Sequence, residues 1–322
     1  MSKVDDLRRG GTISVDELRK PEGEVVMMRV GMSVWMGVVV VLGGYGLLPE
    51  EKAAAGDPAQ RGEMQTLAQR ARAVTQVIAH RGSSEDRPEC TLAALRRAIV
   101  VGATASEVDV RWTRDRKLVI LHDATLDRTT NGKGKIGAAT LAEVRRLDAG
   151  SWFDVKYRAE KVPTLREVLE VGRGRIDVLL DLKEQGATYD RQVVDTVKRF
   201  GDPKKTIIGV RSVAQARRFR SMLPQARQLG LIPQPESIQT FVAAGVETIR
   251  LWPRWIKAEP KLVAEVHRLK VGLHVNGSKG ARTEVEAALS HRPTSLSSDD
   301  PGRLVKTLKS IAGGVDGARR PE

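Results

Sequence analysis

The chain has 322 residues, of which 41% are hydrophobic and 29% charged, and this balance is typical of a globular protein with a sizeable core rather than of a disordered chain. Its single cysteine, Cys90, excludes an internal disulfide framework. The net charge of +14 points to anionic partners, but the basic residues are spread along predicted helices, so a solvated surface explains them better than nucleic-acid binding does.

An uncharged apolar run, Val30–Leu48, interrupts the polar N-terminal tail that we predict over residues 1–55. The run is long enough to span a bilayer, and basic residues precede it while acidic ones follow, which places its C-terminal side outside the cytoplasm. Two interpretations stay open. The run is kept as a membrane anchor, or translation starts at Met27 or Met28 and a signal peptide is cleaved near Ala53–Ala55. Both predict an exported protein, either periplasmic or extracellular, or one anchored in a membrane with the rest of the chain outside the cytoplasm.

Beyond residues 56–73, which we interpret as a linker or a first helix, short apolar β runs alternate with amphipathic helical stretches. Eight β runs are predicted: Val77–His80, Ser106–Val110, Ile176–Lys183, Thr206–Val210, Arg227–Ile232, Glu247–Trp252, Val271–Asn276 and Thr294–Asp299. The helical stretches include Thr91–Val101, Leu165–Val171, Tyr189–Phe200 and Ala258–Leu269. This alternation predicts an α/β fold with a parallel sheet, and eight units in about 230 residues fit a closed (β/α)₈ TIM barrel over residues 74–310, with a flexible tail over 311–322. A doubly wound open sheet is the alternative, but no Gly-rich dinucleotide turn follows any strand.

One segment, Leu118–His122, breaks the alternation. Only the turn Arg114–Lys117 separates it from the preceding strand, whereas a parallel crossover needs a dozen residues or more. We therefore predict an antiparallel hairpin that brings His122 opposite Asp109, within a residue or two. The Gly- and Thr-rich residues 123–162 then form a small insertion over the barrel mouth.

Charged side chains gather at the ends of the predicted strands. Glu107 and Asp109 are two apart on one strand, so both point to the same face, and Asp181 and Lys183 repeat that spacing on another. In a barrel such strand ends converge on the C-terminal face, where barrel enzymes keep their active sites. The residues expected there are His80, Arg81, Glu107, Asp109, Asp181, Lys183 and Asp299.

These residue types suit phosphodiester chemistry. Three carboxylates without thiolates favour a hard cation such as Ca²⁺ or Mg²⁺, although surface salt bridging is the alternative for each. A cation beside Arg81 and Lys183 would create an electropositive pocket matched to a phosphodiester. His80 and His122 titrate near neutrality and could exchange protons, although either one alone could be a hydrogen-bonded core histidine.

Several motifs occur in a fixed order along Val77–Asp300, and together they resemble the glycerophosphodiester phosphodiesterase family. The matching motifs are His80-Arg81-Gly82, Pro88-Glu89-Cys90-Thr91, Glu107-Val108-Asp109-Val110, His122-Asp123, Arg128-Thr129-Thr130-Asn131-Gly132, Leu147-Asp148-Ala149-Gly150-Ser151-Trp152-Phe153, Pro163-Thr164-Leu165, Asp181-Leu182-Lys183 and Ser298-Asp299-Asp300-Pro301. The resemblance implies a (β/α)₈ barrel with an insertion after the second histidine. It also implies metal-dependent hydrolysis of a glycerophosphodiester to glycerol 3-phosphate and an alcohol.

The resemblance also implies roles for individual residues. These are general acid–base catalysis for His80 and His122, metal binding for Glu107, Asp109 and Asp181, phosphate binding for Arg81 and Lys183, and support of the metal or its ligands for Glu89. Asp299 ends the last strand beside the same pocket. One divalent cation is implied, and we expect Ca²⁺ ahead of Mg²⁺ because free Ca²⁺ is abundant outside the cytoplasm.

Three departures from the family pattern bear on substrate choice. Asp181 stands where the family usually has Glu, so this metal ligand is one methylene shorter. Cys90 replaces a frequent Asn, and here we interpret it as a small residue at a helix start. Leu273–Asn276 lacks the tryptophan that the family commonly has there, a loss that Trp252 could offset.

Two other functions stay open from the sequence. One keeps the fold and replaces the substrate, giving a phospholipase-D-like enzyme that acts on lysophospholipids or sphingolipids at a membrane. The other is a non-catalytic barrel that binds phosphodiesters. The apolar N-terminal run suits the first of these, whereas the complete set of histidines and carboxylates argues against the second.

Overall fold

The computed structural model describes residues 66–313. The predicted N-terminal tail, including the apolar run at 30–48, lies outside the described residues. Within residues 66–313, no helix is both long enough and apolar enough to cross a membrane. The described part begins with a helix, so the end of the segment interpreted as linker or first helix is helical: α1 spans Leu67–Ala73 and is capped by Thr66.

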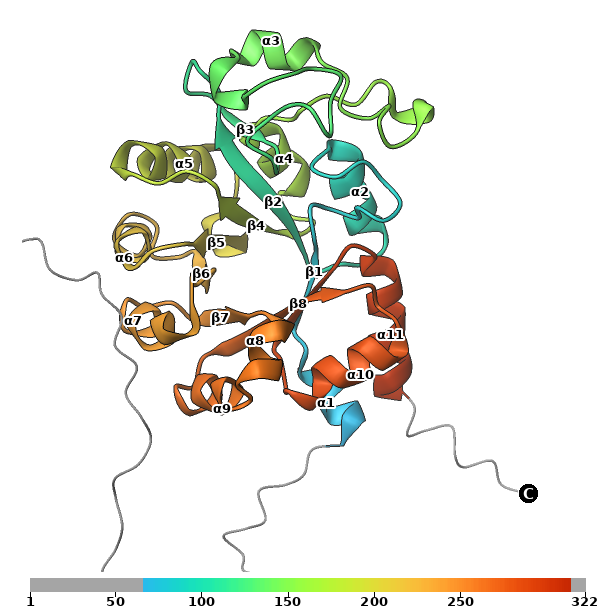
Figure 1. Cartoon of the computed structure of the whole chain (residues 1–322), viewed down its shortest axis with the longest axis vertical. Helices are drawn as coiled ribbons and strands as arrows, with labels where there is room; N and C mark the ends of the chain where they lie inside the picture. Colours follow the sequence, from blue (N-terminus) through green and yellow to red (C-terminus); the bar gives the residue numbers. More distant parts are fainter. Residues whose placement is uncertain (1–65, 314–322) are drawn as a thin grey trace, which may run out of the picture. The chain divides into compact units, whose positions relative to one another are not determined.

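Eight parallel strands close into a barrel in the described part of the chain, which confirms the predicted fold (Figure 1). Closure is visible in the pairing, because β1 bonds both to β9, along Gln76–Ala79, and to β2. The barrel strands are β1 (Gln76–Ala79), β2 (Ala105–Trp112), β4 (Asp177–Leu182), β5 (Thr206–Val210), β6 (Arg227–Gly230), β7 (Thr248–Leu251), β8 (Gly272–Ser278) and β9 (Ser295–Ser298). Every predicted β run therefore corresponds to a strand, with ends that differ by two residues or fewer.

Helices surround the strands on the outside of the barrel (Figure 1). The α-helices after α1 are α2 (Leu92–Val100), α3 (Leu141–Arg146), α4 (Leu165–Gly172), α5 (Ala187–Phe200), α6 (Val213–Met222), α7 (Ile238–Ala243), α8 (Pro253–Ala258), α9 (Lys261–Arg268), α10 (Arg282–Ser290) and α11 (Pro301–Gly313). Short 3₁₀ turns are η2 (Ile136–Ala138), η3 (Val155–Tyr157), η4 (Pro203–Lys205) and η5 (Pro235–Ser237).

Two predicted boundaries are corrected. The helical stretch predicted over Ala258–Leu269 corresponds to α9, which starts only at Lys261 after Pro260, while Ala258 is the last residue of a separate helix, α8. The last helix, α11, continues to Gly313 and buries Ile311, so residues 311–313 are part of the fold and not of a flexible tail. Residues 314–322 lie outside the described part.

The core consists of two layers that follow from alternation along the strands. On β4, Leu179 belongs to a cluster inside the barrel, whereas its neighbour Leu180 packs in the layer between strands and helices. Both faces of each strand are thus buried, which is why the strands appear in the sequence as nearly continuous apolar runs. The inner cluster consists of Ile78, Ala105, Leu179, Ile207, Leu229 and Leu231.

The predicted hairpin is present: β3 (Leu118–Ile120) runs antiparallel to β2, with Val110 opposite Ile120. The backbone N–H of Leu121 donates to the carbonyl of Asp109 at 3.0 Å, so the predicted pairing of His122 with Asp109 is one residue from the actual register. The insertion after His122 contains η2, α3 and η3, and lies beside β3 at one end of the barrel (Figure 1). It has a small core of its own, formed by Val119, Leu121, Leu126, Ile136, Val144, Ala149 and Val162.

Candidate active site

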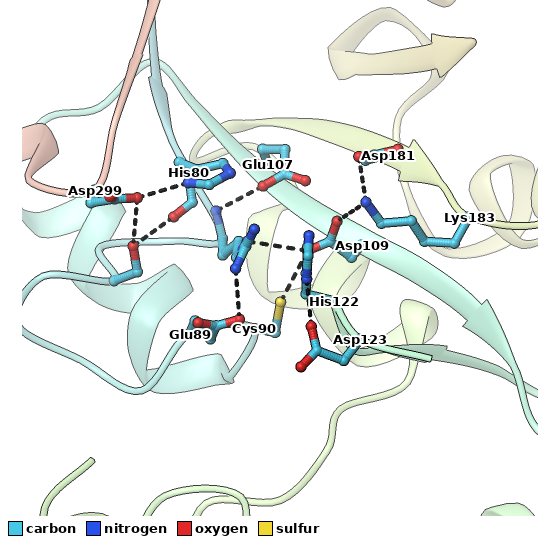
Figure 2. Close-up of polar contacts among 12 residues, drawn as sticks. His80, Glu89, Cys90, Glu107, Asp109, His122, Asp123, Asp181, Lys183 and Asp299 are labelled. Atoms are coloured by element: carbon cyan, nitrogen blue, oxygen red, sulfur yellow. Dashed lines mark hydrogen bonds and ion pairs between the residues drawn. The ribbon is translucent and has the colours of Figure 1, made fainter. Parts of the chain in front are cut away.

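Two neighbouring strands bring the three predicted carboxylates together. Asp109 on β2 lies in register with Asp181 on β4, and Glu107 precedes Asp109 by two residues and so faces the same way. All three side chains are buried, and one oxygen from each lies within 4.8 Å of the others. The sequence prediction of an acidic cluster at this end of the barrel is therefore realised in the fold (Figure 2).

Two cations lie against this cluster. Nζ of Lys183 is 2.7 Å from Oδ1 of Asp109 and 2.7 Å from Oδ2 of Asp181. Arg211, which directly follows β5, donates from Nη2 to both carboxylate oxygens of Asp181 at 2.7 Å. Burial would raise the pKa of Asp181, but the charges of Lys183 and Arg211 outweigh it and lower the pKa. For Glu107, burial and the charge of Asp109 raise the pKa to about 8.

The first histidine, His80, directly follows β1. Its Nδ1 lies 2.7 Å from Oδ1 of Asp299, which follows β9, the strand paired with β1. Burial alone would lower the pKa of His80, but the hydrogen bond to Asp299 and the charge of Glu107 raise it above its ordinary value. The same contact with His80 lowers the pKa of Asp299. The pair thus holds the imidazole in one orientation and favours its protonated form.

The second histidine, His122, lies two residues after the end of β3 and is held in a similar way. Its Nδ1 lies 2.7 Å from Oδ1 of Asp123, and its carbonyl accepts a 2.7 Å hydrogen bond from Arg111. Arg128, from the insertion, binds Asp123 at 2.7 Å and Glu89 at 2.8 Å. Its hydrogen bond lowers the pKa of Asp123 well below the usual range. Figure 2 shows His80 and His122 beside the acidic cluster, each with its own carboxylate partner.

The loop after β1 supplies the predicted phosphate ligand Arg81. Its backbone N–H donates to Oε2 of Glu107 at 2.8 Å, and its guanidinium donates to Oε1 of Glu89 at 3.0 Å and lies 3.7 Å from Asp109. Glu89 is therefore bound by Arg81 and Arg128 and lies outside the group of three carboxylates that could hold an ion. The contact of Glu89 with Arg81 links it to the site, and its role toward a metal or the metal's ligands stays a prediction.

Cys90 has a closer contact with the site than its interpretation as a small helix-start residue implied. The helix cap of α2 is Thr91, while Cys90 adopts a φ of +60° and its buried Sγ donates to Oδ2 of Asp109 at 3.4 Å. Burial and the charge of Asp109 raise the pKa of this thiol well above its ordinary value. The side chain is thus a protonated hydrogen-bond donor to a carboxylate and not a reactive thiolate.

Three charged or titratable residues near the cluster were not among the predicted site residues: Arg211, Arg250 and His274. Asp123 belonged to a matching motif, but its contact with His122 was not predicted. Arg211 follows a predicted strand, and Arg250 and His274 lie within two others, so the strand-end rule that found Asp181 would also have found them. Trp252, which was expected to offset a missing indole, instead has the guanidinium of Arg250 over its ring, at 4.3 Å from the ring centre.

The residues present fit a divalent cation. Glu107, Asp109 and Asp181 offer only hard oxygen donors, in a buried position and close enough to share one ion. Burial and, after it, the charge of Asp109 raise the pKa of Glu107 to about 8, and a bound cation would favour the ionised form of this carboxylate. This acidic group can therefore hold a metal, and its oxygen chemistry suits Ca²⁺ or Mg²⁺.

Comparisons with known proteins agree with this geometry. The Glycerophosphoryl diester phosphodiesterase family matches residues 80–278. A glycerophosphodiester phosphodiesterase from Caldanaerobacter subterraneus is 32% identical over 246 residues, which cover 73% of this chain and 98% of the relative. The human glycerophosphodiester phosphodiesterase 1 is 42% identical over 109 residues, a third of each chain.

Solved structures are similar over the whole barrel. The glycerophosphodiester phosphodiesterase of Agrobacterium tumefaciens superposes with a TM-score of 0.62 at 27% identity, covering 72% of this chain and 99% of that one. An Oleispira antarctica phosphodiesterase, solved with the product sn-glycerol-3-phosphate, has a TM-score of 0.63 at 24% identity over 75% and 99% of the two chains, which supports the fold alone. With a family match across most of the barrel and a relative covered almost end to end, the chain belongs to the glycerophosphoryl diester phosphodiesterase family.

Proposed function

We propose that this protein hydrolyses glycerophosphodiesters to sn-glycerol 3-phosphate and an alcohol, using one divalent cation, with Ca²⁺ preferred over Mg²⁺. The observation that supports this most strongly is the pair of histidines beside three buried carboxylates, each with Nδ1 at 2.7 Å from a carboxylate of its own. That contact engages Nδ1 and leaves Nε2 of each ring available to substrate. Two oriented proton-exchanging groups beside an electropositive pocket are what phosphodiester cleavage requires.

In this proposal the two histidines divide the proton transfers. One takes a proton from the nucleophile, which is water or the adjacent glycerol hydroxyl, while the other gives a proton to the oxygen of the leaving alcohol. The raised pKa of His80, which the hydrogen bond to Asp299 sustains against burial, suits it to be the donor. His122 then acts as the acceptor.

The positive charge of the pocket is proposed to come from two basic side chains and from the metal ion. Arg81 and Lys183 are proposed to bind phosphoryl oxygens, and Glu107, Asp109 and Asp181 to hold the metal. When bound, the metal stabilises the negative charge that builds on the phosphoryl group. The contacts of Arg211 with both oxygens of Asp181 support this role, because they fix the shorter side chain in one orientation.

The location of the protein is also a proposal. The uncharged run at residues 30–48, with basic residues before it and acidic ones after it, favours export, either as a cleaved signal peptide or as a retained membrane anchor. Determining the N-terminal residue of the protein purified from its own cells tests this. An N-terminus near residue 56 indicates cleavage, an intact one in the membrane fraction indicates an anchor, and an intact one in the cytosol refutes both.

The test of the activity uses the full-length chain and measures glycerol 3-phosphate released from glycerophosphocholine. The protein is stripped of metal, then supplied with Ca²⁺ or Mg²⁺. We expect activity only with a cation, and a loss of about 100-fold or more in His122→Ala. His267→Ala, whose imidazole lies 3.0 Å from the carbonyl of His291, is the matched control and should retain activity.

A second substrate class has one specific observation in its favour. An apolar pocket of about 440 Å³ lies between α8 and α10, and it shares Asn276 with the cavity under the acidic cluster. Such a pocket could accept the acyl chain of a lysophospholipid. Faster turnover of lysophosphatidylcholine than of glycerophosphocholine, in the same metal-restored assay, would replace the first substrate with the second. Binding without turnover of either would indicate a non-catalytic barrel.

A further inference from the structure

Arg250, on β7, is a buried cation inside the barrel. Its side chain is packed against Trp252, and only 8% of the residue is exposed. It lines a cavity of about 40 Å³ that reaches the acidic cluster. The other residues around this cavity are Ile78, His80, Glu107, Leu179, Asp181, Leu229, Leu231, His274, Asn276 and Ser297.

Among the described residues, Arg250 differs from the other cations of the site in having no partner. Its Nε is buried without a hydrogen-bond acceptor, and no carboxylate of residues 66–313 forms an ion pair with its guanidinium. In contrast, Lys183 and Arg211 lie 2.7 Å from the carboxylate of Asp181. Arg81 is bound to Glu89 at 3.0 Å. The cations near the cluster are therefore committed to carboxylates of the protein, with the exception of Arg250.

A buried charge without a hydrogen-bonded partner is costly. The charges of Asp181 and Glu107 favour the charged form of Arg250, but burial outweighs them. Burial lowers the pKa of Arg250 only to about 10, so the guanidinium stays charged at neutral pH. His274 cannot compensate, because burial lowers its pKa to about 3 and keeps it neutral. The remaining walls of the cavity are mixed: four residues are aliphatic, and the carboxylates of Glu107 and Asp181 belong to the acidic cluster. An anion that enters the barrel mouth would supply the missing partner.

We propose that Arg250 binds an oxyanion of the substrate, in a subsite separate from Arg81 and Lys183. The planar guanidinium offers a fork of N–H donors that matches a phosphate or carboxylate, and packing on Trp252 restricts its rotamers before the anion arrives. The oxyanion is either the phosphoryl group of the diester or an acidic group on the leaving alcohol. This inference rests on the proposed function and extends it to the way in which the substrate is recognised.

The test compares Arg250→Gln with Arg254→Gln in the full-length protein. Arg254 is a matched control, because it lies 5.4 Å from the same Trp252 ring but is exposed on α8. For glycerophosphoglycerol, whose only anion is the diester, we expect Arg250→Gln to raise KM or lower kcat/KM about 10- to 100-fold. Arg254→Gln should stay within about two-fold of the wild type, and Arg250→Lys should recover part of the loss.

A second substrate separates the two sources of the anion. Equal losses in Arg250→Gln on glycerophosphoglycerol and glycerophosphoserine identify the shared phosphoryl group as the ligand. A loss confined to glycerophosphoserine identifies the head-group carboxylate. If kcat/KM for both substrates stays within about two-fold of the wild type, the proposal is wrong.

Two further measurements keep the result independent of folding and of turnover. If Arg250 had only a structural role, replacing it would lower Tm. Because the replacement removes an unpaired buried charge, we instead expect the Tm of Arg250→Gln to be unchanged or higher. Arg250→Met serves as a second variant. Calorimetric binding of glycerol 3-phosphate should weaken about 10-fold or more in both variants if the phosphoryl group is the ligand. Inactivity of the wild type on every diester would refute the proposed function, while this binding experiment would still test Arg250.

Discussion

Each histidine of the site is oriented by a carboxylate, and the two carboxylates come from different loops. His80 is oriented by Asp299, which lies more than two hundred residues away in the sequence. Asp299 directly follows β9, the strand that closes the barrel beside β1. His122 uses its own neighbour Asp123, which is fixed in turn by Arg128. Loss of either carboxylate should therefore free the orientation of a ring without removing the ring.

Replacing Asp299 with Asn is expected to lower the pKa of His80. The native contact favours the protonated ring, so the folded protein has a pKa above the ordinary value. Once the carboxylate is gone, burial remains as the main influence, and burial lowers the pKa. The limb of the pH profile of kcat/KM that reports His80 should then move to lower pH.

Glu85→Gln provides the control for this change, because Glu85 lies next to the same loop and its side chain pairs with Lys279 rather than with a histidine. Its pH profile should match that of the wild type. An unchanged limb in Asp299→Asn would contradict the assignment of that limb to His80.

The carboxylates and histidines were predictable because their strands are apolar and bounded by charged or polar residues, so strand ends were easy to locate in the sequence. Counting residues across the hairpin placed His122 opposite Asp109, one position from Leu121, which is the residue that lies there. The partners of these residues were not predictable in the same way. That Arg211 binds Asp181 and that Arg250 binds no carboxylate depend on side-chain packing across the barrel, and strand periodicity carries no information on packing.

At the scale of elements, the loop between β1 and α2 packs the segment that contains His80 and Arg81 against α2. Gly82 in that loop has a φ of +82°, and a Cβ built on it would lie 2.6 Å from Cβ of Ala94 on α2. The loop therefore passes too close to the helix to accept a side chain, and this approach carries His80 and Arg81 to the acidic cluster.

Gly82→Ala is expected to destabilise the protein by both backbone strain and steric overlap. Gly134→Ala is a matched control, since Gly134 has a similar φ of +86° but nothing within 4 Å of the added Cβ. The control should cost about 1 kcal/mol for the backbone alone, and Gly82→Ala roughly 1–3 kcal/mol more. Urea unfolding measures both values, and equal losses would show that the contact with Ala94 is unimportant.

At the scale of the whole molecule, the folded barrel holds three buried carboxylates close together. Their convergence depends on the register of β2 with β4, so the unfolded chain has no comparable site. A cation that binds there consequently binds the native state alone, and its free energy of binding adds to the free energy of unfolding.

Metal removal should therefore lower Tm. A cation present at 100 times its Kd adds about 2.7 kcal/mol to the free energy of unfolding. For a domain of this size, each kcal/mol corresponds to roughly 2–4 °C of Tm. Scanning calorimetry of the full-length protein, with chelator and then with Ca²⁺ or Mg²⁺, should show a rise of about 5–10 °C. The rise should vanish in Asp109→Asn and persist in Glu170→Gln, which alters an exposed ion pair on α4. An equal rise in Asp109→Asn would place the cation elsewhere.

The antiparallel strand β3 has a consequence for how this enzyme family can diversify. The three clustered carboxylates and His80 belong to the barrel, but His122 arrives on a hairpin whose insertion has a separate small core. Mutations that accumulate in that core can reshape the rim beside His122 while the barrel beneath keeps its strand register. An exchange of the insertion between relatives should therefore change the surroundings of one histidine without rebuilding the barrel.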